Sequence, residues 1–233
     1  MTPEGFSLLY EEGPCLAVGK PAGLLTQAPP HIDSLERRLR DFLKLREGKA
    51  GKIYLGVLHR LDRPVSGVLL FARHVRAARR LSSQFEQRMI DKQYVAILAG
   101  DLVADEDEWI DYVGKVPDQA QAVALPADHP DARVARLRYR VLARTAGRTC
   151  VELKLETGRF HQIRLQSSLR GVPILGDTQY GSHEPFVAPA EDERERCIAL
   201  HARRISFYHP MTHEQRTVEA PLPDYWGNWQ DYL

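Results

Sequence analysis

The nine residues HRLDRPVSG, at positions 59–67, lie between two apolar runs, YLGVL at 54–58 and VLLFAR at 68–73. Short apolar runs bounded by proline and glycine are typical of buried strands, so the nine residues predict a short, charged connection inside what should be core. The connection holds one acid, Asp62, which is flanked by Arg60 and Arg63. Asp62 is therefore either a turn residue neutralised by its neighbours or a carboxylate held in place for chemistry.

Strand patterns outnumber helix patterns in the rest of the chain. Because the strands do not alternate regularly with helices, the predicted fold class is α+β, with a mixed, largely antiparallel central sheet and flanking helices and loops. We predict one domain over residues 1–233. Strands are predicted at 7–10, 15–18, 54–58, 67–72, 92–100, 135–143, 149–155 and 198–208. Helices are predicted from the N-cap Ser34 to Gly48, over 75–89, and from the end of TGRFHQIR to Gly171.

The composition is that of a soluble globular protein, with 43% hydrophobic and 27% charged residues in a chain of 233. No apolar run approaches the roughly 20 residues needed to cross a bilayer, and the N-terminus does not resemble a secretory signal. The three cysteines are scattered and form no CxxC pair. This pattern argues against a disulfide framework or a cysteine zinc site and predicts a cytoplasmic protein without a membrane segment.

The formal net charge of +1 hides a segregation of charge along the chain. Residues 34–52 hold seven Lys or Arg and three acids, and residues 73–92 hold six and two. Residues 101–131 hold nine acids and one lysine, with prolines that predict a loop-rich excursion. Such segregation predicts either a basic face for a polyanion or ordinary solvated helix faces.

A second polar group of residues lies in TGRFHQIR, residues 157–164. Arg159, His161, Gln162 and Arg164 place several hydrogen-bond donors beside an apolar strand, which suits binding of a carboxylate and a polar substrate. A capped helix start explains the same letters. Tyr94, near the start of the predicted strand 92–100, is either a packing residue or a platform for a nucleobase.

Motifs for metals and nucleotide cofactors do not occur in the sequence. There is no HExxH, and the histidines near the C-terminus lie in HPMTHE, which predicts a turn between strands. There is also no GxGxxG and no GxxxxGK followed by Ser or Thr. We therefore predict no metal and no cofactor.

Taken together, the motifs resemble the RluA-type pseudouridine synthase family. The resemblance rests on HRLDRPVSG, on KPAGLLT upstream and on KQYVAILAG downstream. It extends through TGRFHQIRLQSSLRGVPILGDTQYG and LHARRISFYHP, in the order in which the family has these blocks. The matching blocks cover nearly the whole chain, from Cys15 to Pro223.

The resemblance implies isomerisation of a uridine within RNA to pseudouridine, without cofactor or metal. It implies that Asp62 is the catalytic residue, that Tyr94 packs against the target base or acts as a base at C5, and that Arg164 pairs with Asp62. Leu165 would be an apolar pocket wall, and Arg60 would assist RNA insertion or contact a phosphate. The remaining residues expected to bind substrate are His59, Arg159, His161 and Gln162.

The predicted partner is tRNA or rRNA, bound by a monomer, and the acidic stretch 101–131 is not expected to face the RNA. Two residues depart from the family pattern: Val65 stands where Thr is common, and Phe160 where a polar residue is common. The sequence leaves no room before the first strands for the small N-terminal RNA-binding domain of some relatives.

Three functions stay open at this point. The first is an RNA pseudouridine synthase. The second is a non-catalytic RNA-binding or RNA-folding protein on the same scaffold, against which the joint presence of Asp62, Tyr94 and Arg164 argues. The third is hydrolysis of an N-glycosidic bond, but a hydrolase usually needs a second carboxylate that neither motif supplies.

Overall fold

The computed structural model describes residues 5–188, 192 and 195–232 of the chain. The chain forms two compact units. The first comprises Met1–Lys92, Ala190–Arg196 and Ala202–Pro223, and the second comprises Gln93–Pro189, Cys197–His201 and Asp224–Leu233. A single catalytic domain over residues 1–233 stays a prediction. Across the described ranges, no helix is long and apolar enough to span a membrane.

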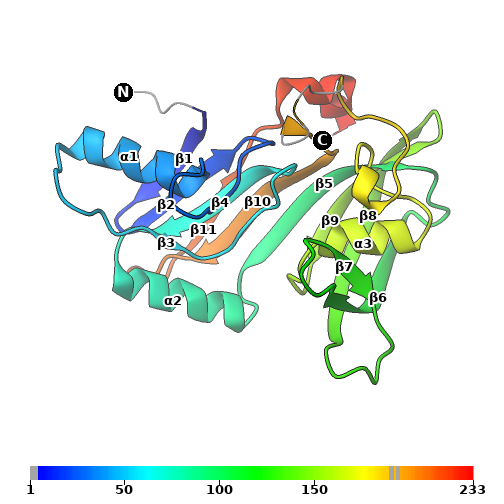
Figure 1. Ribbon diagram of the computed structural model, residues 1–233, viewed down its shortest axis with the longest axis horizontal. Helices are drawn as coiled ribbons and strands as arrows, with labels where there is room; N and C mark the ends of the chain where they lie inside the picture. The colour runs from blue at the N-terminus through cyan, green and yellow to red at the C-terminus, as the bar shows by residue number, and fades with distance from the viewer. Residues whose placement is uncertain (1–4, 189–191, 193–194, 233) are drawn as a thin grey trace. The chain divides into compact units, whose positions relative to one another are not determined.

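The first unit is built on a sheet in which β1, β2, β4 and β10 lie side by side in that order (Figure 1). Two shorter strands extend it, β3 along β4 and β11 along β10. The pairings of β1 with β2, β2 with β4 and β10 with β11 are antiparallel. The bounds are β1 Ser7–Glu12, β2 Cys15–Lys20, β3 Gly56–Val57, β4 Ser66–Ala72, β10 Leu200–Tyr208 and β11 Gln215–Glu219.

Helix α1 (Leu35–Glu47) follows the prediction closely. The Ser34 hydroxyl accepts a hydrogen bond from the Arg37 N–H, and Gly48 ends the helix in the left-handed conformation. Both ends are fixed by residues within one turn, so the local sequence suffices to predict them. The side chains that α1 buries are those of Leu35, Leu39 and Leu43.

Helix α2 (Val75–Glu86) lies on the opposite side of the β2, β4 and β10 strands from α1 (Figure 1). Its residues Ala77 and Leu81 pack into a core with alternate residues of β2, β4, β10 and β11. The helix ends at Glu86, so the prediction of a helix to residue 89 is wrong at this end. Arg88 adopts a left-handed φ of 58°, and the Met89 N–H donates to the Gln84 carbonyl, which closes the helix.

Two strand predictions in the first unit are also corrected. The predicted strand 54–58 pairs only at β3, where Gly56 lies opposite Ala72 and Val57 opposite Phe71. The predicted strand 198–208 begins at Leu200, and a further strand, β11, follows it that was not predicted by residue range. Strand β11 gives no apolar periodicity, since Val218 is its one buried residue. The predicted turn within HPMTHE is confirmed: it joins β10 to β11.

The second unit contains an antiparallel sheet in the order β5-β9-β8-β6-β7, with helix α3 packed beside β6 and β7. Its strands confirm the mixed, largely antiparallel α+β prediction. The bounds are β5 Asp91–Ala99, β6 Glu106–Lys115, β7 Ala122–Ala124, β8 Arg133–Thr145, β9 Arg148–Leu155 and α3 Gln162–Leu169, with 3₁₀ helices at Thr178–Tyr180 and Asp224–Tyr232.

The acidic stretch 101–131 is rich in loops as predicted, but it also contains two strands that were not predicted, β6 and β7. Trp109 and Val113 are buried at alternating positions of β6. Glu108 lies within salt-bridge distance of Arg136 and Arg138 on the neighbouring strand β8. Acids that are segregated in the sequence therefore face arginines in the folded unit. The large number of acids in this stretch concealed the alternation of buried and exposed residues that is typical of a strand.

Candidate active site

The predicted site residues fall in both units. Those of HRLDRPVSG belong to the first unit, and those of the strand β5 and the TGRFHQIR segment belong to the second. Asp62 and Arg164 are thus in different units, and the pairing of their side chains stays a prediction. Within each unit, the predicted residues are held by their own network of hydrogen bonds.

The loop that carries Asp62 is tied to the preceding Gly- and Pro-rich segment. The Leu61 N–H donates to the Thr26 Oγ1, and the Thr26 hydroxyl donates back to the Leu61 carbonyl, at 3.1 and 2.9 Å. The Gly23 N–H donates to the Arg63 carbonyl at 2.8 Å. These bonds hold the backbone on both sides of Asp62, so the fold sets the position from which its side chain extends.

Lys20 supports the same loop from inside the unit. Its side chain is 2% exposed, and its ammonium donates to the carbonyls of Pro21, Leu24 and Arg63. A buried ammonium is tolerated when its hydrogens are bonded in this way. Lys20 therefore anchors the loop through main-chain oxygens.

His59 is a neutral residue that joins the loop to the sheet. Its Nε2 accepts a hydrogen bond from the Leu70 N–H at 3.0 Å, which leaves the ring proton on Nδ1. Burial, together with the nearby charge of Lys92, lowers the pKa of His59 to about 3. The ring also contacts that of Phe85 in α2. Next to it in the chain, Arg60 is exposed to solvent.

Gly67 closes the motif because no larger residue fits. Its φ is 127°, and a Cβ there would lie 2.3 Å from the Ala202 carbonyl oxygen of β10. The backbone of β4 thus approaches that of β10 more closely than any side chain permits. The glycine at the end of HRLDRPVSG is explained by this approach.

Tyr94 lies on β5, where it is opposite Leu153 of β9. It is 8% exposed. The strand prediction and the position of the tyrosine near its start are confirmed; the catalytic role stays a prediction.

Helix α3 holds Arg164 in a buried, fully specified position. The guanidinium is bidentate to Asp177, with Nε to Oδ2 at 2.6 Å and Nη2 to Oδ1 at 2.8 Å. The Gln179 side-chain oxygen accepts a further bond at 2.8 Å, and the Tyr180 ring lies 4.8 Å from the guanidinium carbon. Such planar, two-point binding fixes both the orientation and the charge of an arginine.

His161, the N-cap residue directly before α3, is neutral as well. Arg164 Nη1 can only donate, so the His161 Nε2 at 3.1 Å accepts and the ring proton is on Nδ1, 2.9 Å from the Tyr180 hydroxyl. Burial and the charge of Arg164 lower the pKa of His161 to about 3. His161 has a left-handed φ of 49°, and its ring stacks on Phe160 at 3.8 Å.

The other predicted residues of this segment contact protein groups. The Gln162 amide donates to the Arg136 carbonyl and to Gln166, and its oxygen accepts from the Thr157 hydroxyl and the Arg159 N–H. Gln162 thus holds the turn before α3. The Arg159 Nε donates to the Val134 carbonyl, and Leu165 packs in an apolar cluster with Val113, Ala122, Ala135 and Tyr180. Substrate contacts of these residues stay predictions.

The sequence analysis did not assign the residues that hold the predicted ones. Asp177 and Tyr180 lie in the GDTQYG block, and Thr26 lies in KPAGLLT, both quoted there without a role. A signal existed for Asp177, because a buried arginine requires an acid. In the described ranges, no three His, Cys, Asp or Glu side chains group as they would around a metal ion.

Comparison with known proteins identifies the class. The family model for RNA pseudouridylate synthase matches residues 15–169. The chain therefore belongs to the RNA pseudouridine synthases, a family of RNA isomerases, and to their RluA-type branch.

Among curated relatives, the chain is 36% identical to tRNA pseudouridine synthase C of Pasteurella multocida, over 94% of this chain and 92% of that protein. It is 33% identical to ribosomal large subunit pseudouridine synthase D of Xanthomonas campestris, over 94% of this chain and 66% of that protein. The chain is also 32% identical to the RNA pseudouridine synthase YlyB of Bacillus subtilis, over 95% of this chain and 71% of that protein.

Solved structures confirm the fold. The human RNA pseudouridylate synthase domain containing 4 superposes with a TM-score of 0.75, covering 97% of this chain and 90% of that chain at 22% identity. The human RNA pseudouridylate synthase domain containing 1 superposes with a TM-score of 0.73, covering 96% of this chain and 86% of that chain at 23% identity.

Proposed function

We propose that this protein converts a uridine in tRNA to pseudouridine, with Asp62 as the catalytic carboxylate. The observation that supports tRNA is the match to the Pasteurella multocida tRNA enzyme, which extends over 92% of that protein. The ribosomal enzyme of Xanthomonas campestris is matched over only 66% of its length. Ribosomal RNA is therefore the second candidate substrate.

The reaction breaks the bond between C1′ and N1, turns the uracil, and joins C5 to C1′; C5 loses its proton and the freed N1 gains one. Asp62 supplies an anion that attacks C1′ or C6, or removes the 2′ proton. The clamped loop around Asp62 supports this role, because a fixed carboxylate loses little further entropy on reaching the reactive geometry. Tyr94 is proposed to pack against the turning base and to act at C5.

Arg164 is proposed to pair with Asp62 and so to keep it ionised, since an adjacent guanidinium lowers a carboxyl pKa. The network of Asp177, Gln179 and neutral His161 supports this proposal by fixing the guanidinium in one orientation. A neutral His161 accepts from Arg164 rather than repelling it. His161, Asp177 and Gln179 are thus positioning residues in the proposed mechanism.

Tritium release from RNA labelled at uridine C5 tests the proposal. The wild-type chain should release tritium from tRNA, and Asp62→Asn should reduce release to background while the protein stays folded. Asp41→Asn is the matched control, because Asp41 is an exposed acid of α1 that pairs with Arg37. Tritium release from ribosomal RNA but not from tRNA would make ribosomal RNA the proposed substrate in place of tRNA. Free uracil would indicate hydrolysis, and full activity of Asp62→Asn would refute the role of Asp62.

A further inference from the structure

The two basic runs of the first unit differ in how their charges are used. The arginines of α1 pair with acids: Arg37 with Asp41, Arg38 with Asp33, Arg40 with Glu36 and Arg46 with Glu11. In α2 and its closing turn, Arg76, Arg79 and Arg88 are exposed, and none has an acidic partner among the described residues. These three residues are called the α2 arginines below.

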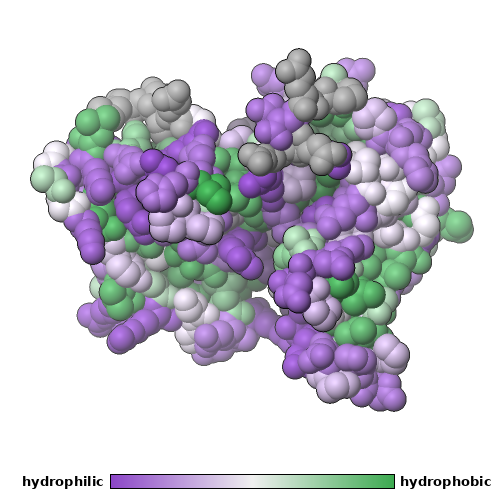
Figure 2. Space-filling model, in the orientation of Figure 1, coloured by the Kyte–Doolittle hydropathy of each residue, from purple (hydrophilic) through white to green (hydrophobic). Residues whose placement is uncertain are grey.

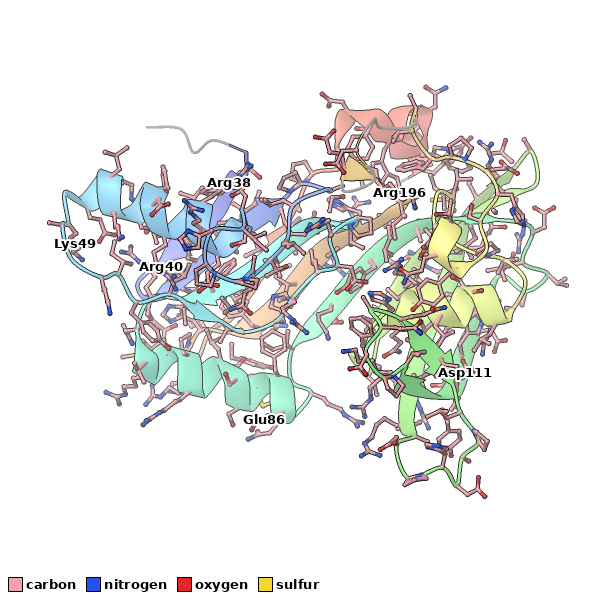
Figure 3. All side chains as sticks on the ribbon, in the orientation of Figure 1. Arg38, Arg40, Lys49, Glu86, Asp111 and Arg196 are labelled. Atoms are coloured by element: carbon pink, nitrogen blue, oxygen red, sulfur yellow. The ribbon has the colours of Figure 1, made fainter. Side chains whose placement is uncertain are left out.

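The two helices also differ in how their charges are placed relative to the helix dipole. Helix α1 has Glu36 in its first turn and Lys44 and Arg46 in its last, which suits the helix dipole. Helix α2 has no acid in its first turn and no base in its last. Arg76 lies in that first turn instead, and Glu86, the one acid of α2, ends the helix (Figure 3). The charges of α2 therefore do not serve helix stability.

Arg88 adds a second cost. It occupies the left-handed position that closes α2, where glycine is preferred and a residue with a Cβ is strained. The Arg88 side chain is nonetheless exposed to solvent, where its charge is available to a ligand. In Figure 2, hydrophilic side chains follow the lower left edge of the molecule, where Figure 1 places α2.

Helix α2, which carries two of the α2 arginines, packs against the loop of Asp62. The ring of Phe85, in the last turn of α2, lies 5.0 Å from the ring of His59. Arg60, the next residue after His59, is exposed. A twelve-residue helix is about 18 Å long, a length that suits several consecutive phosphates.

We propose that the α2 arginines bind the sugar–phosphate backbone of the RNA that presents its uridine to Asp62. The occupant follows from charge: guanidinium groups without acidic partners are suited to phosphate oxygens, and contacts to backbone carry affinity without sequence. The inference rests on the proposed action on RNA and adds the surface by which the RNA is held.

The test measures the Kd of the full-length chain for a fluorescent, unmodified tRNA transcript at several salt concentrations. The triple variant Arg76→Ala, Arg79→Ala, Arg88→Gly should raise Kd at least about tenfold and flatten the slope of log Kd against log salt by about 2. The matched control, Arg37→Ala, Arg38→Ala, Arg40→Ala, removes three charges from α1 and should change Kd less than about twofold, because those charges are already paired.

Equal weakening by both triple variants would mean that net charge alone matters and would overturn the proposal, as would no weakening by the α2 triple. Arg88→Gly alone guards against misfolding, because glycine suits the left-handed position. It should raise Kd about two- to threefold without lowering the Tm. Tritium release with an unchanged KM in the α2 triple would refute this surface alone. Binding that depends on the α2 arginines, without tritium release, would refute the proposed function alone.

Discussion

Helices α2 and α3 both carry arginine, but in opposite environments. Arg164 of α3 is 4% exposed, and its guanidinium is bonded to Asp177, Gln179 and His161. Arg76 and Arg79 of α2 are exposed and lack acidic partners among the described residues. The buried guanidinium of α3 is bonded to protein groups, whereas the exposed guanidinium groups of α2 are available to bind a ligand. Removing partners or arginines should therefore affect stability in α3 and binding in α2.

The largest effect is expected at Asp177. Asp177→Ala removes the carboxylate that is bidentate to the buried Arg164 guanidinium and should lower the free energy of unfolding by about 3–5 kcal/mol. Urea unfolding measures this loss, with Asp41→Ala as the exposed control, expected to cost less than about 1 kcal/mol. The double variant Asp177→Leu, Arg164→Met should recover part of the loss because it removes both charges. An equal loss of unfolding free energy in Asp177→Ala and Asp41→Ala would contradict the difference drawn between buried and exposed charges.

Acid should weaken the protein through its buried neutral histidines. The pKa values of His59 and His161 are lowered to about 3, below the value of about 6.5 in an unfolded chain. The unfolded chain then binds more protons, so their contribution is full above pH 6.5 and is lost as the pH falls from 6.5 towards 3. At pH 5 the loss should be on the order of 2 kcal/mol per histidine.

Urea midpoints at pH 7.5 and pH 5 check this expectation. His161→Gln should reduce the difference between the two midpoints by about half, since His59 remains. His74, the exposed N-cap of α2, provides the matched control, and His74→Asn should leave the difference nearly unchanged. An unchanged difference in His161→Gln would show that His161 is protonated as readily in the folded chain as in the unfolded one.

A smaller effect of opposite sign is expected at the end of α2. Arg88→Gly should raise the free energy of unfolding by about 1 kcal/mol, because glycine adopts a positive φ without strain. Thermal unfolding measures the gain, and Arg88→Ala, which keeps a Cβ, should show none of it. A loss of stability in Arg88→Gly would indicate that the arginine supports the fold.

The smallest effect on stability is expected from Arg76→Ala with Arg79→Ala. Surface changes of this kind stay within about 0.5 kcal/mol, and removing a positive charge from the first turn favours the helix dipole slightly. The same urea assay measures it. A loss of more than about 1 kcal/mol of unfolding free energy would mean that these arginines stabilise α2, which would contradict the difference drawn between α2 and α3.

Local signals made some of this molecule predictable. Ser34 and Gly48 fix the ends of α1 within one turn, and the two runs around HRLDRPVSG gave the region of β3 and the strand β4. Strand β6 was missed because its acids are neutralised by arginines of β8, which lie about 30 residues further along the chain. Composition suggested a loop where pairing between distant residues makes a strand.

The site was predictable in a different way. Asp62, Tyr94 and Arg164 came from the resemblance of whole blocks, not from any local pattern. Helix α3 is buried on nearly every side and bears glutamine, arginine and serine there, so it has no apolar stripe to predict. The acid that satisfies Arg164 follows it by 13 residues, in a turn whose role depends on the fold.

The close approach of Gly67 to Ala202 also concerns the order in which the chain is made. Strand β4 emerges from the ribosome long before β10, its neighbour in the sheet. Until then, β4 has an open edge beside the loop of Asp62, and open edges invite pairing with other chains. Strand β4 therefore gains its neighbour β10 only after about 130 further residues have been synthesised, and its edge at Gly67 is exposed until then.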